Sequence, residues 1–188
     1  MAPMSETSVH IVEYDPAWPT LAGDAVAELR ATLPQEIVEI EHIGSTAVPG
    51  LAAKPVIDLM AATPDLETVS RREDALQDLG YRPHTNGMVD RLLYFRTAGG
   101  VRTHILHVVT LASWPTRNQR IFRDYLRNHP LDAQRYGQLK RAIATAGTPG
   151  DDYTKAKTAL IQEIVDRART ELGLLPEPVW EKPASTGS

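Results

Sequence analysis

The chain has 188 residues, of which 42% are apolar and 23% are charged, and its net charge is −4. These values are typical of a globular protein with a substantial core, and they argue against a surface that binds nucleic acid over its whole area. The sequence contains no cysteine, which excludes disulfide bonds, thiolate catalysis and zinc held by cysteine.

The first ten residues, MAPMSETSVH, lack the basic and apolar segments of a signal peptide. No apolar run approaches the length of a membrane span. We therefore expect a cytoplasmic protein with no membrane partner.

The first third of the chain predicts one helix between strands. Asp15 and Pro16 suit the N-cap and first turn of this helix, and apolar residues recur at helical spacing as far as Leu33. A later run is apolar and β-branched apart from Asp58, which is typical of a central strand. The expected elements are an edge strand over 9–14, a helix over about 16–33, a strand over 35–43 and a central strand over 55–62.

The rest of the chain predicts a hairpin followed by helices. The expected elements are a helix over 63–80, short strands over 81–82 and 92–96, a long strand over 101–111, and helices over 115–128, 131–146 and 151–173. This order indicates an α/β (α+β) fold, in which helices flank a mixed sheet. We expect one domain over 9–173, with a helical C-terminal portion over about 115–173 and flexible termini at 1–8 and 174–188.

One stretch, 40–59, combines residues that phosphate and metal sites use. It reads IEHIGSTAVPGLAAKPVIDL. The Gly44-Ser45 pair at a strand end lets backbone N–H groups approach an anion, and Asp58 on the next strand could hold a cation beside it. The same residues also suit an ordinary turn, with Asp58 paired to Lys54 or to an arginine, because a carboxylate in an apolar strand needs a partner.

The long strand adds two candidate histidines. His104 and His107 are three residues apart, so that ideal alternation places them on opposite faces of the sheet. We favour His107 for the site, because Val108 and Val109 follow it into the expected core. The alternative is one packed and one surface histidine, since a histidine pair alone is a weak metal signal.

Basic residues gather on two of the C-terminal helices. In the helix over 115–128, Arg120, Arg123 and Arg127 share one side, which could bind a triphosphate or could be a solvated face. Near the start of the last helix, Lys155 and Lys157 form a second basic cluster, where anions bind readily.

Five segments together resemble the GrpB-like family of the nucleotidyltransferase superfamily, in collinear order over roughly residues 9–170. They read VEYDPAWP (12–19), IEHIGSTAVPGLAAKPVIDL (40–59), RTHILHVV (102–109), FRDYLRNHP (122–130) and YTKAKT (153–158). The resemblance implies a mixed sheet of the polymerase β-type nucleotidyltransferase fold. It also implies that the segment 46–53 is helix-like.

In that superfamily a Gly-Ser pair holds the nucleotide phosphates, and two acids on the next strand, with a third further on, bind Mg²⁺. Gly44-Ser45 matches the first element and Asp58 matches the first acid. Met60 stands in the place of the second acid, and His107 stands where the third is expected. The resemblance therefore implies one metal ion held by Asp58 with Glu41 or His107.

The function implied is Mg²⁺-dependent (or Mn²⁺-dependent) transfer of a nucleotidyl group from an NTP, with ATP expected, to a small-molecule acceptor, or a related ATP-dependent ligation. The expected site residues are Asp58, His107 and His42 for catalysis; Gly44, Ser45, Thr46, Lys54, Arg120, Arg123, Arg127 and Lys157 for the nucleotide; and Asp58, His107 and Glu41 for the metal. The alternative is a non-catalytic domain that binds a nucleotide or a CoA-like ligand and regulates a partner enzyme, which the missing second acid favours. The sequence leaves the acceptor and a homodimer open.

Overall fold

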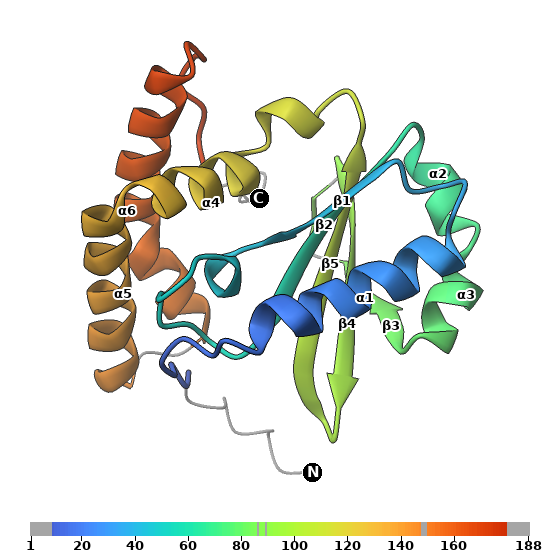
Figure 1. Cartoon of the computed structure of the whole chain (residues 1–188), viewed down its shortest axis with the longest axis horizontal. Coiled ribbons are helices and arrows are strands. Elements are labelled where there is room, and N and C mark those ends of the chain that lie inside the picture. The colour runs from blue at the N-terminus through green and yellow to red at the C-terminus, as the bar shows by residue number, and fades with distance from the viewer. Residues whose placement is uncertain (1–8, 86, 89, 148–149, 180–188) are drawn as a thin grey trace, which may run out of the picture.

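The computed structural model describes residues 9–179 apart from 86, 89, 148 and 149. Of the flexible ends expected at 1–8 and 174–188, only 174–179 are therefore among the described residues. The centre of the fold is a five-stranded sheet with the order β1-β2-β5-β4-β3 (Figure 1). The strands are β1 (Glu39–Ile43), β2 (Ile57–Thr63), β3 (Tyr81–Pro83), β4 (Arg91–Ala98) and β5 (Val101–Thr110). The β2–β5 pair is parallel and the other pairs are antiparallel, which confirms the predicted mixed sheet.

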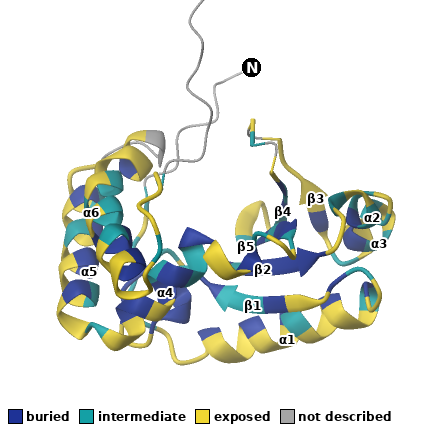
Figure 2. Cartoon of the chain, turned by 90° about the horizontal axis from the view of Figure 1, so that it is seen from above, coloured by how far each residue is buried: buried dark blue, intermediate teal, exposed yellow. Residues whose placement is uncertain are grey.

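Three helices cover one face of the sheet: α1 (Trp18–Thr32), α2 (Leu66–Ser70) and α3 (Glu73–Asp78). Just before α1, the Oδ1 atom of Asp15 accepts a hydrogen bond from the Ala17 N–H at 2.8 Å. Ala22, Ala25 and Leu29 then point inward at helical spacing. Figure 2 shows the result, with buried residues on the sheet side of α1 and exposed residues on its outer side.

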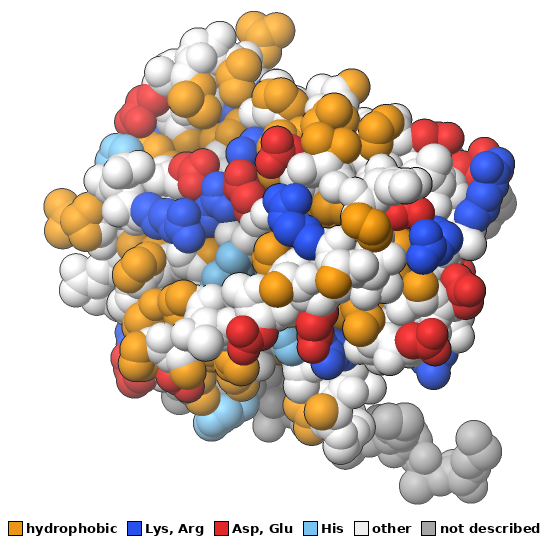
Figure 3. Space-filling view, turned by 45° about the vertical axis from the view of Figure 1, so that its right-hand side comes forward, with side chains coloured by type: hydrophobic (Ala, Val, Ile, Leu, Met, Phe, Trp, Pro, Cys, Tyr) orange, Lys and Arg blue, Asp and Glu red, His pale blue; other side chains and the backbone are white. Residues whose placement is uncertain are grey.

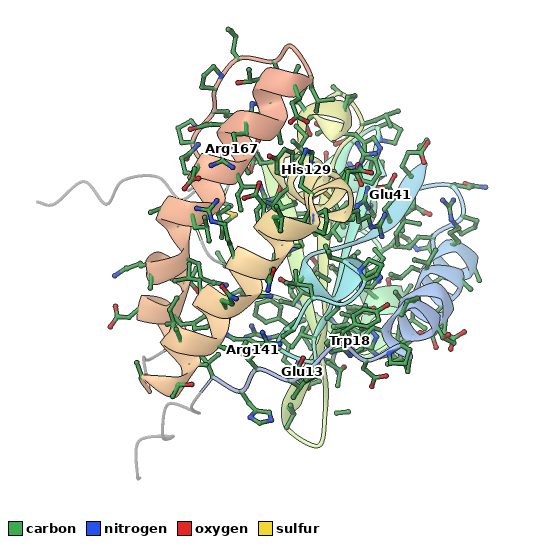
Figure 4. All side chains as sticks on the ribbon, turned by 60° about the vertical axis from the view of Figure 1, so that its left-hand side comes forward. Glu13, Trp18, Glu41, His129, Arg141 and Arg167 are labelled. Atoms are coloured by element: carbon green, nitrogen blue, oxygen red, sulfur yellow. The ribbon has the colours of Figure 1, made fainter. Side chains whose placement is uncertain are left out.

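The C-terminal helices α4 (Asn118–Asn128), α5 (Pro130–Thr145) and α6 (Gly150–Glu171) gather beside the sheet, at the left of Figure 1. They share a second apolar cluster, in which Val48 and Leu51 pack against Tyr136 and Ile164. Glu13 and Arg141 lie side by side (Figure 4), and the 2.7 Å ion pair between them joins α5 to the segment before α1. The helices therefore form a wall next to the sheet end at which β1 finishes.

Three local expectations need correction. The segment 9–14 forms a single bridge, Val12 to Ala53, instead of an edge strand of the sheet. The segment 46–53 contains one 3₁₀ turn, η1 (Ser45–Ala47), and no longer helix, because Pro49 and Gly50 follow it. The helix expected over 63–80 is divided into α2 and α3 after Ser70, where the chain tightens: the Arg72 N–H donates to the Val69 carbonyl at 2.9 Å.

None of the helices in the described part of the chain is long and apolar enough to cross a membrane. On the face seen in Figure 3, basic and acidic side chains are interspersed instead of forming a patch of one sign.

Candidate functional site

The register of the sheet decides which candidate residues share a face. Asp58 on β2 pairs with Ile43 on β1 and with Ile105 on β5, and Met60 pairs with His107. Directly paired residues point to the same side of a sheet, and residues two apart on a strand do so too. Asp58 and His107 therefore lie on one face, the face away from α1.

Gly44 brings the end of β1 close to Asp58. Its φ is +74°, and a Cβ atom at this position would lie 2.5 Å from the Asp58 Oδ2 atom. Only glycine allows both the backbone conformation and this close approach. Ser45 then opens η1 next to the carboxylate, so the Gly-Ser pair and Asp58 form one unit, as the sequence indicated.

Two hollows meet at this unit. Both are lined by Ser45, Asp58, Thr154 and Lys157. The larger hollow, of about 400 Å³, adds His107 and mainly apolar side chains: Ile43, Phe122, Tyr136, Ile161 and Val165. The smaller hollow, of about 260 Å³, adds three basic side chains: Lys54, Arg102 and Lys140. One side of the site is therefore apolar and the other is basic.

The basic side chains of the smaller hollow are held in place by aromatic rings and by burial. The Nζ atoms of Lys54 and Lys157 lie 4.5 Å and 4.4 Å from the centre of the Tyr153 ring. Lys140 is only 1% exposed, and its Nζ lies 4.6 Å from the centre of the Tyr136 ring. Among the described residues, the Lys140 ammonium has no hydrogen-bond partner.

Burial also changes the proton affinity of these groups. It raises the pKa of Asp58 to about 7, although Lys157, Arg102, Lys54 and Lys140 act in the opposite direction. Burial lowers the pKa of Lys140 to about 7 and that of Lys157 to about 8. Strongly shifted pKa values in a hollow are typical of functional sites.

Among the described residues, His107 is the one histidine that lines either hollow. It borders the larger hollow, and among the described residues its Nδ1 atom has no hydrogen-bond partner. Burial, together with the charges of Arg91 and Arg117, lowers its pKa to about 3. Its ring is therefore neutral at physiological pH.

His42 and Thr46 are placed differently from the expectation. His42 pairs with Leu59, so it lies on the α1 face, opposite to Asp58. Its Nε2 atom lies 2.8 Å from the Thr46 hydroxyl oxygen, and burial lowers its pKa to about 4. Of the two, only Thr46 borders the smaller hollow, so the expected catalytic role of His42 does not agree with the geometry.

The arginines of α4 bind the end of β1 instead of lining either hollow. Glu41 accepts hydrogen bonds from Arg120 and forms a 2.7 Å ion pair with Arg123. Arg123 also donates to the His42 carbonyl at 2.8 Å, and Arg127 donates to the Ala47 carbonyl at 2.9 Å. The expected phosphate-binding stripe is corrected accordingly: a carboxylate and two carbonyls attract these side chains to β1 and η1.

The side chains present do not fit a metal ion held by the protein. Within the described ranges, no three His, Asp or Glu residues are grouped so that they could hold one. Met60 is fully buried among apolar side chains, and Glu41 is occupied by arginines. Asp58 stands among basic groups, whereas Mg²⁺ and Mn²⁺ prefer several oxygen ligands.

Two residues of the site were missed by sequence reasoning. Lys140 occupies a position on the inward face of α5, four residues after Tyr136 and three before Ile143, both buried. A lysine within such an apolar stripe was a usable signal. Arg102 stands at the exposed start of β5, and the sequence assigned it no role, although it opens the segment RTHILHVV.

The sheet, with its Gly-Ser turn beside a single acid on the next strand, defines a protein of the nucleotidyltransferase fold. The structure of terminal uridylyl transferase 4 from Trypanosoma brucei with bound dUTP resembles this chain with a TM-score of 0.55 and 12% identity, over 92% of this chain and 62% of that one. Within this class, the chain belongs to the GrpB family, whose model, described as GrpB protein, matches residues 8–167.

Relatives of the chain agree with this assignment. The crystal structure of the conserved protein GrpB from Enterococcus faecalis has a TM-score of 0.81 and 31% identity, over 87% of this chain and 99% of that one. A UPF0157 protein of Pseudomonas aeruginosa is 36% identical over 165 residues, which are 85% of this chain and 67% of the relative. A protein of Mycobacterium leprae named dephospho-CoA kinase is 27% identical over 94% of this chain, which spans 48% of that relative.

Proposed function

We propose that the protein binds a nucleoside triphosphate across the two hollows, with the polyphosphate in the smaller one and the nucleoside in the larger one. The observation that carries this proposal is Lys140, a buried ammonium without a hydrogen-bond partner among the described residues, at the wall of the smaller hollow. The charged form of this lysine is expensive to bury unless an anion pairs with it, and its pKa of about 7 in the free protein reflects that cost. The apolar lining and the volume of the larger hollow suit an organic ligand.

The reaction that we propose is transfer of the nucleotidyl group, with ATP as the expected donor, to a small-molecule acceptor, either as the final step or within a ligation. The acceptor oxygen attacks the α-phosphorus and loses its proton to Asp58, while the bond from the α-phosphorus to the bridging oxygen breaks. Pyrophosphate leaves with the negative charge, which the lysines neutralise. Asp58 suits the role of base because it borders both hollows and because its pKa of about 7 is near the working pH.

A second candidate is non-catalytic binding of a nucleotide or a CoA-like ligand. Two observations favour it: Met60 in place of a second acid, and the similarity to a relative named dephospho-CoA kinase. CoA carries adenosine and phosphate groups, so the same hollows would suit it. In this case the domain would support a partner enzyme.

Calorimetric titration with ATP and with CoA, followed by an assay for pyrophosphate release over a panel of acceptors, separates these functions. Lys157→Met should weaken binding of the ligand at least 10-fold, whereas Lys155→Met should not change it. Lys155 is a matched control because it lies on the same helix, exposed beside Asp152 and outside both hollows. Equal effects of the two variants would refute the site, and tight binding of CoA without pyrophosphate release from ATP would favour the second candidate.

A further inference from the structure

The smaller hollow has the charge pattern of an anion site and not that of a metal site. Four basic side chains lie close enough to Asp58 that their positive charges lower the pKa of its carboxyl group, against the effect of burial. They come from four separate parts of the chain: Lys54 before β2, Arg102 on β5, Lys140 on α5 and Lys157 on α6. The fold therefore gathers these groups around one point, which a solvated charge run on a single helix would not do.

Lys140 lacks a close anionic partner among the described residues. Its ammonium is buried and lies near an aromatic ring, but no acceptor among the described residues is within hydrogen-bond distance. Asp58 acts on it only through the longer-range attraction of opposite charges. A buried cation in this position leaves room for an anionic group that the protein itself does not supply.

The place where a second acid would stand is closed to a metal ligand. Met60 lies two residues after Asp58 on the same face and packs with Ile43, Ala62, Val109 and Trp114. A carboxylate at this position would be buried in an apolar cluster. Among the described residues that line the two hollows, there is therefore one carboxylate where the nucleotidyltransferase fold implies several, and there are basic groups in their place.

We propose that Lys54, Arg102, Lys140 and Lys157 take the place of the divalent cation, so that this site binds a polyphosphate without a metal ion. Phosphate oxygens in the smaller hollow then receive hydrogen bonds from ammonium and guanidinium groups, as charge-assisted contacts. Asp58 in this arrangement is a like charge next to the ligand and not a bridge to it. The inference rests on the proposed function, since it specifies how the nucleotide phosphates are held.

The test measures binding of inorganic tripolyphosphate and of ATP by calorimetry, in EDTA and in excess Mg²⁺. We expect the affinity in EDTA to equal or exceed that in Mg²⁺, because Mg²⁺ reduces the charge of the ligand. In EDTA, Lys140→Met and Lys157→Met should each bind tripolyphosphate and ATP at least 10-fold more weakly than the parent protein. Lys155→Met should bind them with unchanged affinity. Thermal melting shows whether each variant is folded. If Lys140→Met does not fold, the affinity of Lys157→Met decides the test.

The direction in which Asp58→Asn changes the binding affinity shows whether Asp58 repels the polyphosphate or holds a metal ion. If Asp58 is a like charge, the variant binds tripolyphosphate more tightly than the parent protein, by a few-fold. If Asp58 holds a metal ion, the variant loses Mg²⁺-dependent binding. Binding that requires Mg²⁺ and disappears in Asp58→Asn would overturn this inference and leave the proposed function standing, whereas no binding of ATP in either condition would overturn the proposed function itself.

Discussion

Gly44 and Asp58 are in such close contact that a Cβ atom on residue 44 would lie 2.5 Å from the Oδ2 atom and 3.0 Å from the Cβ atom of Asp58. Gly44→Ala should therefore both strain the backbone and displace the carboxylate, with a loss of about 2–4 kcal/mol in the free energy of unfolding. Gly50→Ala is the control, because its φ of +76° gives the same strain while no atom lies within 4 Å of the added Cβ. Urea denaturation measures both, and equal losses would show that the contact with Asp58 has no effect on stability.

Lys140 should reduce the stability of the unliganded protein. Lys140→Met removes a buried ammonium that has no hydrogen-bond partner among the described residues, and it keeps a side chain of similar length. We expect the free energy of unfolding to rise by about 1–3 kcal/mol at pH 7, while polyphosphate binding is lost. Burial lowers the pKa of this lysine in the folded state, so the gain should shrink above pH about 7 and disappear as the unfolded lysine deprotonates too. A destabilised variant at pH 7 would contradict this expectation.

The Glu41 contacts predict a pH-dependent contribution to stability. Burial raises the pKa of Glu41, but the hydrogen bonds from Arg120 and Arg123 outweigh it, and the pKa in the folded state is lowered. Glu41 therefore stabilises the fold above its unfolded pKa of 4.5, and this contribution is lost as the pH falls further. Glu41→Gln should cost about 2 kcal/mol at pH 7, and the cost should decrease as the pH falls below 4.5.

Glu67→Gln is the matched control for this variant, because the pair of Glu67 with Arg71 is exposed on both sides. Exposed pairs contribute less than about 1 kcal/mol. Nucleotide affinity of Glu41→Gln should stay within about twofold of the parent, since Glu41 borders neither hollow. A large change in nucleotide affinity would instead indicate that the α4 arginines contact the ligand.

Polyphosphate binding should be accompanied by proton uptake. The pKa values of Lys140 and Lys157 are about 7 and about 8 in the free protein, and a nearby anion raises both. Affinity should therefore fall as the pH rises from 7 to 9, by as much as about 10-fold per pH unit for each proton taken up. At pH 8, the calorimetric enthalpy should differ between HEPES and Tris, which release protons with different enthalpies. Equal enthalpies in the two buffers would mean that these groups do not change protonation.

Much of the fold was accessible from the sequence because local patterns encode it. Apolar spacing predicts α1 and α4–α6, and the apolar run around Asp58 predicts the central strand. Gly44, Ser45 and Asp58 could be joined in advance because they come from adjacent elements. The predictions that were wrong concern residues whose position depends on a second element. His42 lies outside the site because it pairs with Leu59. Arg123 lies at β1 because it forms an ion pair with Glu41 across a helix–strand contact.

The role of Lys140 could not be predicted from its local sequence either. Its own helix shows only that a lysine stands on an inward face. The functional meaning arises when α5 is placed beside the segment before β2 and the start of α6, which local spacing does not determine. Long-range packing, and not propensity, assembled this site.

The parallel pairing of β2 with β5 has a consequence for the order of folding. Asp58 meets Ile105 only when the whole segment between them has been closed into a loop, and Lys140 and Lys157 are added from still later in the chain. Such non-local pairing is slow, because loop-closure entropy is lost before the contacts form. We expect the hollows to be completed late, after the folding transition state, so a bound polyphosphate should slow unfolding and protect the chain from proteolysis while the folding rate stays unchanged.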